Sequence, residues 1–63
     1  MEEIELTDLA QRAGVTYKEF DKVIDVYKGG VTIVVFTQSH PEDRRYQLKA
    51  FLIGRISLQE TNK

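Results

Sequence analysis

The 63-residue sequence contains no cysteine and no tryptophan, and it has one histidine and one proline. Without cysteine, a disulfide framework, a thiolate metal site and a cysteine nucleophile are excluded. Because His40 is the only imidazole, a histidine metal cage is excluded too, and we expect no metal and no cofactor. No apolar run is long enough to span a bilayer and nothing resembles a signal peptide. The sequence therefore predicts a cytoplasmic protein without a membrane partner.

Catalytic motifs are missing as well. Ser39 precedes His40, but no third group and no oxyanion-hole motif accompanies this pair. Glu42 and Asp43 have no evident partner for acid–base chemistry, and Gly29-Gly30 lacks the rest of a phosphate-binding pattern. A chain of this length is also too short to enclose a dry pocket. We therefore expect no enzymatic activity.

Length and composition predict a single domain over residues 1–63, with tails at 1–4 and 59–63. Hydrophobic residues make up 41% of the chain, which is enough for an ordinary core. A domain of this size buries only about 60% of its unfolded surface, so self-association or a protein partner is expected. The net charge is −1, yet residues 6–58 carry eight basic and six acidic side chains. Charge alone therefore selects no partner.

A first helix is predicted to begin near Thr7, which is a good N-cap residue. Ala10 and Ala13 supply its buried side, and Gly14 offers the left-handed backbone conformation that ends helices. Before it, residues 3–6 alternate between charged and apolar side chains. This alternation allows a short N-terminal strand.

A second helix is predicted over residues 16–28. Thr16–Glu19 fits a capping box, in which the first and last side chains each bond an orphan backbone amide. Apolar residues then follow at spacings that place them on one helical face: Phe20, Val23, Ile24 and Tyr27. Gly29-Gly30 is expected to end this helix.

The C-terminal half favours a β-hairpin over residues 31–58. β-Branched side chains dominate residues 31–37, which predicts a strand. Turn-forming residues follow at 38–43, and apolar and polar side chains then alternate over 45–52 as in a half-exposed strand. A helix over 41–56 is the alternative, because Pro41 and the acidic residues after it also suit a helix N-terminus.

The spacing of small residues indicates a helix-turn-helix over residues 6–28. Ala10 would let the two helices cross closely, and Gly14 follows at the four-residue step that the turn requires. Residues 6–24 resemble the N-terminal motif of lac-repressor-type regulators. Because an apolar hairpin follows, the layout looks more like winged-helix modules of the MerR and excisionase types, or Cro-like repressors. The fold expected is α+β, with a helix-turn-helix followed by a wing-like antiparallel hairpin.

This resemblance implies a small regulator or a phage or plasmid architectural factor that binds double-stranded DNA as a dimer. The second helix would enter the major groove, reading bases from its N-terminal part. Basic side chains at the hairpin tip and on the first helix would contact phosphates. The residues expected to contact DNA are Gln11, Arg12, Thr16, Tyr17, Lys18, Lys22, Arg44 and Arg45.

A second hypothesis is a non-enzymatic protein-interaction module: an inhibitor, an assembly factor or a structural subunit. Asp21 and Asp25 would lie on the expected DNA-reading face, where phosphates repel carboxylates. The predicted strand at 31–36 is apolar on both faces, so the helices can cover only one of them. A partner or a second copy of the chain would cover the other face.

Overall fold

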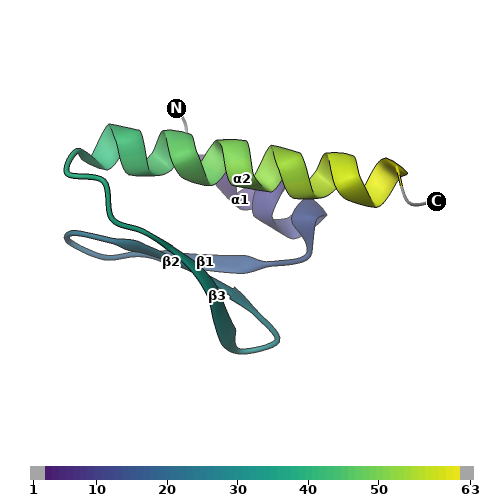
Figure 1. The fold of residues 1–63 in the computed structure, drawn as a ribbon, viewed down its shortest axis with the longest axis horizontal. Helices are drawn as coiled ribbons and strands as arrows, with labels where there is room; N and C mark the ends of the chain where they lie inside the picture. The colour runs from purple at the N-terminus through teal and green to yellow at the C-terminus, as the bar shows by residue number, and fades with distance from the viewer. Residues whose placement is uncertain (1–2, 62–63) are drawn as a thin grey trace.

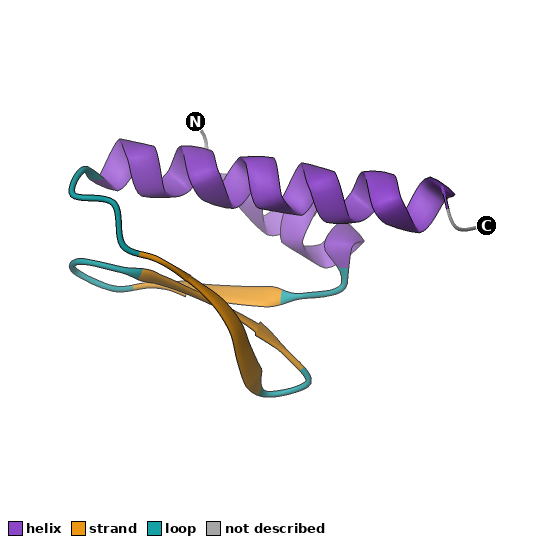
Figure 2. Cartoon of the chain, viewed as in Figure 1, coloured by secondary structure: helices purple, strands orange, loops and turns teal. Residues whose placement is uncertain are grey.

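The computed structural model describes residues 3–61 of the chain. The elements follow in the order α1 (Glu3–Ala13), β1 (Thr16–Glu19), β2 (Ile24–Lys28), β3 (Val31–Phe36) and α2 (Pro41–Thr61). The three strands form one antiparallel sheet in the order β1-β2-β3. Both helices lie on the same side of this sheet, with α1 packed against α2 (Figure 1, Figure 2).

The predicted helix-turn-helix over 6–28 is wrong, because residues 16–28 form strands β1 and β2 instead of a second helix. Burial along β2 has a period of two: Ile24 and Val26 are fully buried, whereas Asp25 and Tyr27 on the opposite face are half-buried. The β-branched residues of this segment lose rotamer freedom in a helix and pack well on a pleated sheet. This preference, together with pairing on both sides of β2, overrides the capping-box pattern.

The predicted wing-like hairpin over 31–58 is also wrong, and the alternative helix is present as α2. Pro41 begins this helix, and Glu42 and Asp43 lie in its first turn. Their negative charges interact favourably there with the positive end of the helix dipole. Leu48 and Leu52 are buried one helical turn apart on its core side. A strand would also have placed these two side chains on one face, because they are an even number of residues apart. The alternation of polar and apolar residues over 45–52 therefore fits a strand as well as a helix.

The two ends of the chain also differ from expectation. Residues 3–6, which allowed a short strand, belong to α1, so that prediction is wrong. Of the predicted tails, residues 3–4 lie in α1 and 59–61 lie in α2. The remaining tail positions, 1–2 and 62–63, fall outside the described residues.

Three local predictions are confirmed. The first helix ends at Ala13, and Gly14 follows with a φ of +74°. Ala10 and Ala13 are buried. The strand expected from the β-branched run over 31–37 is β3, Val31–Phe36. The glycine and strand signals depend on the residues' own backbone or rotamer preferences, and the burial of the two alanines follows from the side of α1 on which they lie.

Gly29 and Gly30 form the two-residue turn of the β2–β3 hairpin, with φ values of +60° and +80°. Positive φ at both central residues is typical of a type I′ turn, whose twist matches that of the flanking strands. Lys28 pairs with Val31 across the turn. The register then shifts between Val26 and Tyr27, which leaves Ile33 without a Cα partner and marks a β-bulge in β3.

The core lies between the sheet and the two helices. Its buried hydrophobic residues come from every element except β1 and β3, and from the turn after α1: Leu6, Ala10, Ala13, Val15, Ile24, Val26, Leu48 and Leu52. The rings of Phe36 and Phe51 meet edge to face at a centroid distance of 6.0 Å, which joins β3 to α2. Across residues 3–61, α1 and α2 both lack the length and apolar character needed to traverse a membrane.

Candidate functional site

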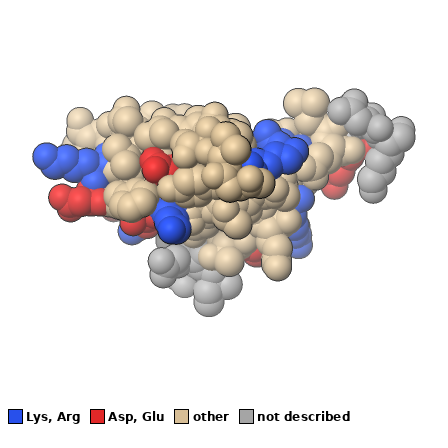
Figure 3. Space-filling view, turned by 90° about the horizontal axis from the view of Figure 1, so that it is seen from below, with Lys and Arg blue, Asp and Glu red and all other residues tan. Residues whose placement is uncertain are grey.

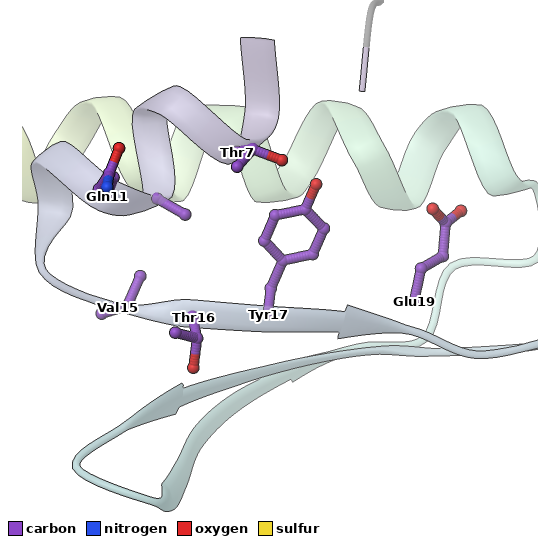
Figure 4. A pocket seen from close by; sticks show the side chains of 7 residues that line it. Thr7, Gln11, Val15, Thr16, Tyr17 and Glu19 are labelled. Carbon is purple, nitrogen blue, oxygen red and sulfur yellow. The ribbon is translucent and has the colours of Figure 1, made fainter. Parts of the chain in front are cut away.

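A groove of about 490 Å³ lies between α1 and β1. Its lining comes from consecutive turns of the helix on one side and from the strand on the other: Thr7, Ala10, Gln11, Val15, Thr16, Tyr17 and Glu19. Figure 4 shows the Tyr17 ring rising from β1 toward the helix, with its hydroxyl directed toward Thr7. We call this feature the α1–β1 groove.

β1 forms one edge of the sheet, so only one side of its backbone is paired. The Phe20 amide donates to the Val23 carbonyl at 2.8 Å, which makes this pair a hydrogen-bonded pair of the β1–β2 hairpin. Hydrogen-bonded and non-hydrogen-bonded pairs alternate along an antiparallel ladder. The backbone N–H and C=O groups of Tyr17 and Glu19 are therefore directed away from β2, along the open edge.

The other edge of the sheet is less regular. β3 pairs with β2 on one side, and its bulge at Ile33 interrupts the alternation of backbone groups along the strand. The outward groups of Thr32 and Val35 are therefore separated by three residues instead of two. Because a bulge blunts an edge against further pairing, β1 is the better template for an added strand.

A charged pair lies at one end of the α1–β1 groove. The Arg45 Nε donates to Glu19 Oε2 at 2.9 Å, and a second guanidinium nitrogen lies 2.9 Å from the same oxygen. Arg45 comes from α2 and Glu19 from the end of β1, so the pair joins two elements that are distant in sequence. The pair compensates the only charge in the groove lining.

The lining of the groove combines polar and apolar side chains. Its polar side chains carry hydroxyl, amide and carboxylate groups, and Ala10 and Val15 supply apolar walls. Tyr17 and Glu19 are the ionisable residues of the lining, and the Glu19 carboxylate is paired with Arg45. Residues 3–61 contain no group of three or more His, Cys, Asp or Glu residues that could hold a metal ion.

The structure brings three of the predicted DNA-contacting residues together in this groove: Gln11, Thr16 and Tyr17. They meet there across α1 and β1, because residues 16–19 are a strand. The helix predicted over residues 16–28 does not exist, so Thr16 and Tyr17 do not lie at the leading end of a recognition helix.

The other predicted DNA-contacting residues are spread over the molecule. Arg12 pairs with Asp8 one turn earlier on α1, at 3.2 Å. Lys18 is exposed on the sheet face away from the helices, and Lys22 is exposed in the β1–β2 turn. Arg44 is only 3% exposed and donates to backbone carbonyls. Arg45 is paired with Glu19. The five basic residues predicted to contact DNA therefore do not form one surface.

Thr7, Ala10, Val15 and Glu19 belong to the groove but were not expected in a functional site. The alternation of apolar Ile24 and Val26 with Asp25 in the sequence is the signal that could have found them. A strand at 24–28 followed by Gly29-Gly30 and a second strand predicts a hairpin. That hairpin would have left residues 16–19 as a third strand beside the first helix.

Comparison of the chain with protein-family models, curated proteins and solved structures finds no match in any of the three.

Proposed function

We propose that this chain is a non-enzymatic protein-interaction module that binds an extended segment of a partner protein in the α1–β1 groove. The observation that carries the proposal is the open edge of β1, which lies along a groove walled by α1. An extended peptide can add to such an edge as a further strand. Main-chain hydrogen bonds then supply affinity, and pockets for alternate side chains supply specificity.

The backbone of β1 sets the hydrogen bonds of the added strand. Tyr17 and Glu19 each direct one N–H and one C=O group outward, so an antiparallel segment can make four main-chain hydrogen bonds with them. β1 has four residues, and at a rise of about 3.4 Å per residue it matches a segment of about four to five residues. Alternate side chains of the segment would face the groove.

The walls of the groove predict the chemistry of those side chains. Ala10 and Val15 offer apolar surface, and Gln11 offers an amide group at the rim. The carboxylate of Glu19 is already compensated by Arg45. A segment with small or β-branched side chains toward the groove and no charge at those positions fits this lining, because a buried charge without a partner is costly.

The distribution of basic residues also favours a protein partner over DNA. Arg12, Arg45 and Lys49 are each engaged with a carboxylate of the chain itself, and Arg44 is buried. DNA binding depends on several basic side chains that reach phosphates together. DNA reading by a helix-turn-helix is not proposed, because residues 16–28 form no helix.

The test is selection from a display library of random peptides of about seven residues, followed by binding in solution. We expect enrichment of peptides that alternate β-branched residues with others. On addition of a selected peptide, the backbone amides of Tyr17 and Glu19 should show the largest NMR shift changes and become protected from hydrogen exchange. Failure to enrich any peptide, or shifts confined to a different surface, would contradict the proposal.

A matched pair of variants isolates the main-chain hydrogen bond. Glu19→Pro removes an outward N–H without removing a bond to β2, since proline is tolerated where the N–H of an edge strand faces outward. Glu19→Ala keeps that N–H and removes only the pair with Arg45. Peptide affinity should fall about tenfold in Glu19→Pro relative to Glu19→Ala. Equal affinities in the two variants would exclude strand addition at β1.

A further inference from the structure

Lys18 lies on the open edge strand β1, between the two residues that direct backbone groups outward, Tyr17 and Glu19. Those two side chains line the α1–β1 groove. Because side chains alternate along a strand, the Lys18 side chain lies on the opposite sheet face, where it is exposed. Figure 3, which views the molecule from the sheet side, shows a broad uncharged area with charged side chains around it. The β1 edge therefore has a cation on the side away from the groove.

The chain itself supplies no carboxylate partner for Lys18 within residues 3–61, because the ion pairs there join other residues. Asp25 lies directly opposite Lys18 in the β1–β2 register. Its carboxylate instead accepts a hydrogen bond of 3.1 Å from the Tyr27 hydroxyl. The Lys18 ammonium group is therefore available to a carboxylate from outside the chain.

The hydrogen-bond pattern of β1 places an added strand closer to Lys18 than β2 is. The hydrogen-bonded pair at the β1–β2 turn makes Lys18–Asp25 a hydrogen-bonded pair as well, with Cα atoms about 5.5 Å apart. On the open edge the outward backbone groups belong to Tyr17 and Glu19. A residue added opposite Lys18 therefore forms a non-hydrogen-bonded pair with it, in which the Cα atoms are about 4.5 Å apart and the side chains are closer.

We propose that the segment added to β1 carries an aspartate or glutamate opposite Lys18, between two uncharged residues whose side chains face the groove. This inference rests on the proposed strand addition and specifies the class of peptide that the edge selects. Opposite charges on directly opposed residues stabilise a pair of antiparallel strands, whereas like charges destabilise it. An acidic residue at this position pairs with Lys18, and a lysine or arginine there is repelled.

The acidic side chains of the chain do not cancel this preference. Strands lie about 4.8 Å apart, so the added residue is about 10 Å from β2, which carries Asp25. The Debye length is about 8 Å at physiological ionic strength, so this repulsion is largely screened. Glu19 lies on the groove side and is paired with Arg45. The two sides of the added strand therefore meet different selection: uncharged side chains toward the groove and an acidic one away from it.

Peptide-display selection on three forms of the chain tests the inference: wild type, Lys18→Gln and Lys28→Gln. Lys28→Gln is the matched control, because Lys28 is an exposed lysine of β2 beside the β2–β3 turn and its replacement removes the same charge. Wild type and Lys28→Gln should enrich peptides with an acidic residue between two β-branched residues. Lys18→Gln should enrich the β-branched residues without a charge between them. Circular dichroism confirms that each variant is folded.

Binding in solution gives the size of the effect. A selected peptide with blocked ends is compared with versions that carry glutamine or lysine in place of the acidic residue. Wild type should bind the acidic peptide about two- to fivefold more tightly than the glutamine version, and up to about tenfold more tightly than the lysine version. The difference between acid and glutamine should vanish in Lys18→Gln. It should also vanish in about 1 M salt, where the Debye length is about 3 Å.

The NMR shifts of the Tyr17 and Glu19 amides separate this inference from the proposed function. Peptides that shift both amides but bind equally well with acid, glutamine or lysine would overturn the acidic preference and leave strand addition intact. An acidic preference that persists in Lys18→Gln, or disappears in Lys28→Gln, would also exclude Lys18 as its source. If no selected peptide shifts these amides, strand addition and the preference that rests on it both fail.

Discussion

The guanidinium of Arg44 lies against the backbone carbonyl of Asp21, with Nη2 donating to the oxygen at 3.1 Å. Its Nη1 donates to the carbonyl of Gln38 at 2.7 Å. One side chain thereby joins the β1–β2 turn to the loop that leads into α2. Arg44 is 3% exposed, and among residues 3–61 its hydrogen-bond partners are backbone carbonyls. Neutral dipoles therefore solvate a buried cation here.

Removal of Arg44 should destabilise the fold strongly. Arg44→Ala leaves carbonyl acceptors without their charged donor and opens a space in the buried region, so the free energy of unfolding should fall by about 2–4 kcal/mol. Arg44→Lys should recover less than half of this loss, because an ammonium group cannot span acceptors on two loops as a planar fork does. Urea denaturation measures both values.

Arg45→Ala provides the comparison for Arg44. Arg45 is more exposed, with 42% side-chain exposure in its pair with Glu19, so the loss should stay below about 1 kcal/mol. If Arg44→Ala were no more destabilising than Arg45→Ala, the loops would not depend on the buried guanidinium.

Alanine in place of glycine should have opposite effects on stability in α2 and in the β2–β3 turn. Gly54 lies within α2, and a Cβ added there meets no atom within 4 Å. Gly54→Ala should therefore raise the free energy of unfolding by about 0.5–1 kcal/mol, since alanine has the higher helix propensity.

Gly30→Ala tests the opposite effect. An added Cβ at Gly30 also meets no atom within 4 Å, but the φ of +80° is costly for alanine. The variant should lose about 1–2 kcal/mol. Thermal or urea unfolding of the two variants measures the contrast. A stabilised Gly30→Ala would show that the type I′ turn does not form in solution.

The pair between Glu5 and Lys49 should be visible in an acid titration. Lys49 Nζ lies 2.8 Å from Glu5 Oε1, and this hydrogen bond and the charge of Lys49 lower the pKa of the Glu5 carboxyl. Because the folded-state pKa is the lower one, the pair stabilises the fold above the unfolded pKa, and this contribution is lost as pH falls through the folded value. NMR titration of the Glu5 side chain should show the lowered pKa, and Lys49→Met should return it toward its ordinary value. An unchanged pKa in Lys49→Met would contradict the pairing of α1 with α2 through these residues.

The Tyr27 hydroxyl should lose its proton at a higher pH than an ordinary tyrosine, because its pKa is raised. Burial raises the pKa of its hydroxyl, and the hydrogen bond to the Asp25 carboxylate and the negative charge there raise it further. A raised folded-state pKa means that this contribution to stability is complete below the unfolded pKa and is lost as pH rises through the folded value. In an NMR titration of the tyrosine rings, Asp25→Asn should lower the pKa of Tyr27 but leave it above the ordinary range, because burial remains. A drop below that range would exclude burial as the main cause.

Sequence reasoning succeeded where one residue's own preference was strong. Gly14 ends a helix with positive φ, and the run over 31–36 is a strand. It failed at 16–28, where two patterns overlapped. Val23, Ile24 and Tyr27 share a helical face, but β2 buries Ile24 together with Val26 on a pleated face. The pattern that predicted a helix used Val23, Ile24 and Tyr27 and left out Val26. It therefore could not distinguish a helix from a strand in this segment.

The groove could be predicted only in part. Gln11 was predicted to bind DNA from the first helix and Thr16 and Tyr17 from a recognition helix, yet the three meet across a helix and an edge strand. Glu19 was taken as part of a capping box, whereas it pairs with Arg45 across 26 positions of sequence. Contacts of this range depend on how α2 docks on the sheet, which no local pattern contains.

The sequence by itself determined the absence of cysteine chemistry, the end of the first helix and the position of β3, because cysteine content, glycine conformation and β-branched rotamers are local properties. Only the tertiary structure decided that residues 16–28 are strands, that β1 is an open edge and that Arg44 is buried. The physical reason is that a short amphipathic segment can bury its apolar side chains in either conformation. The buried face of α2, with Leu48 and Leu52 at its centre, selects the sheet by packing against Ile24 and Val26.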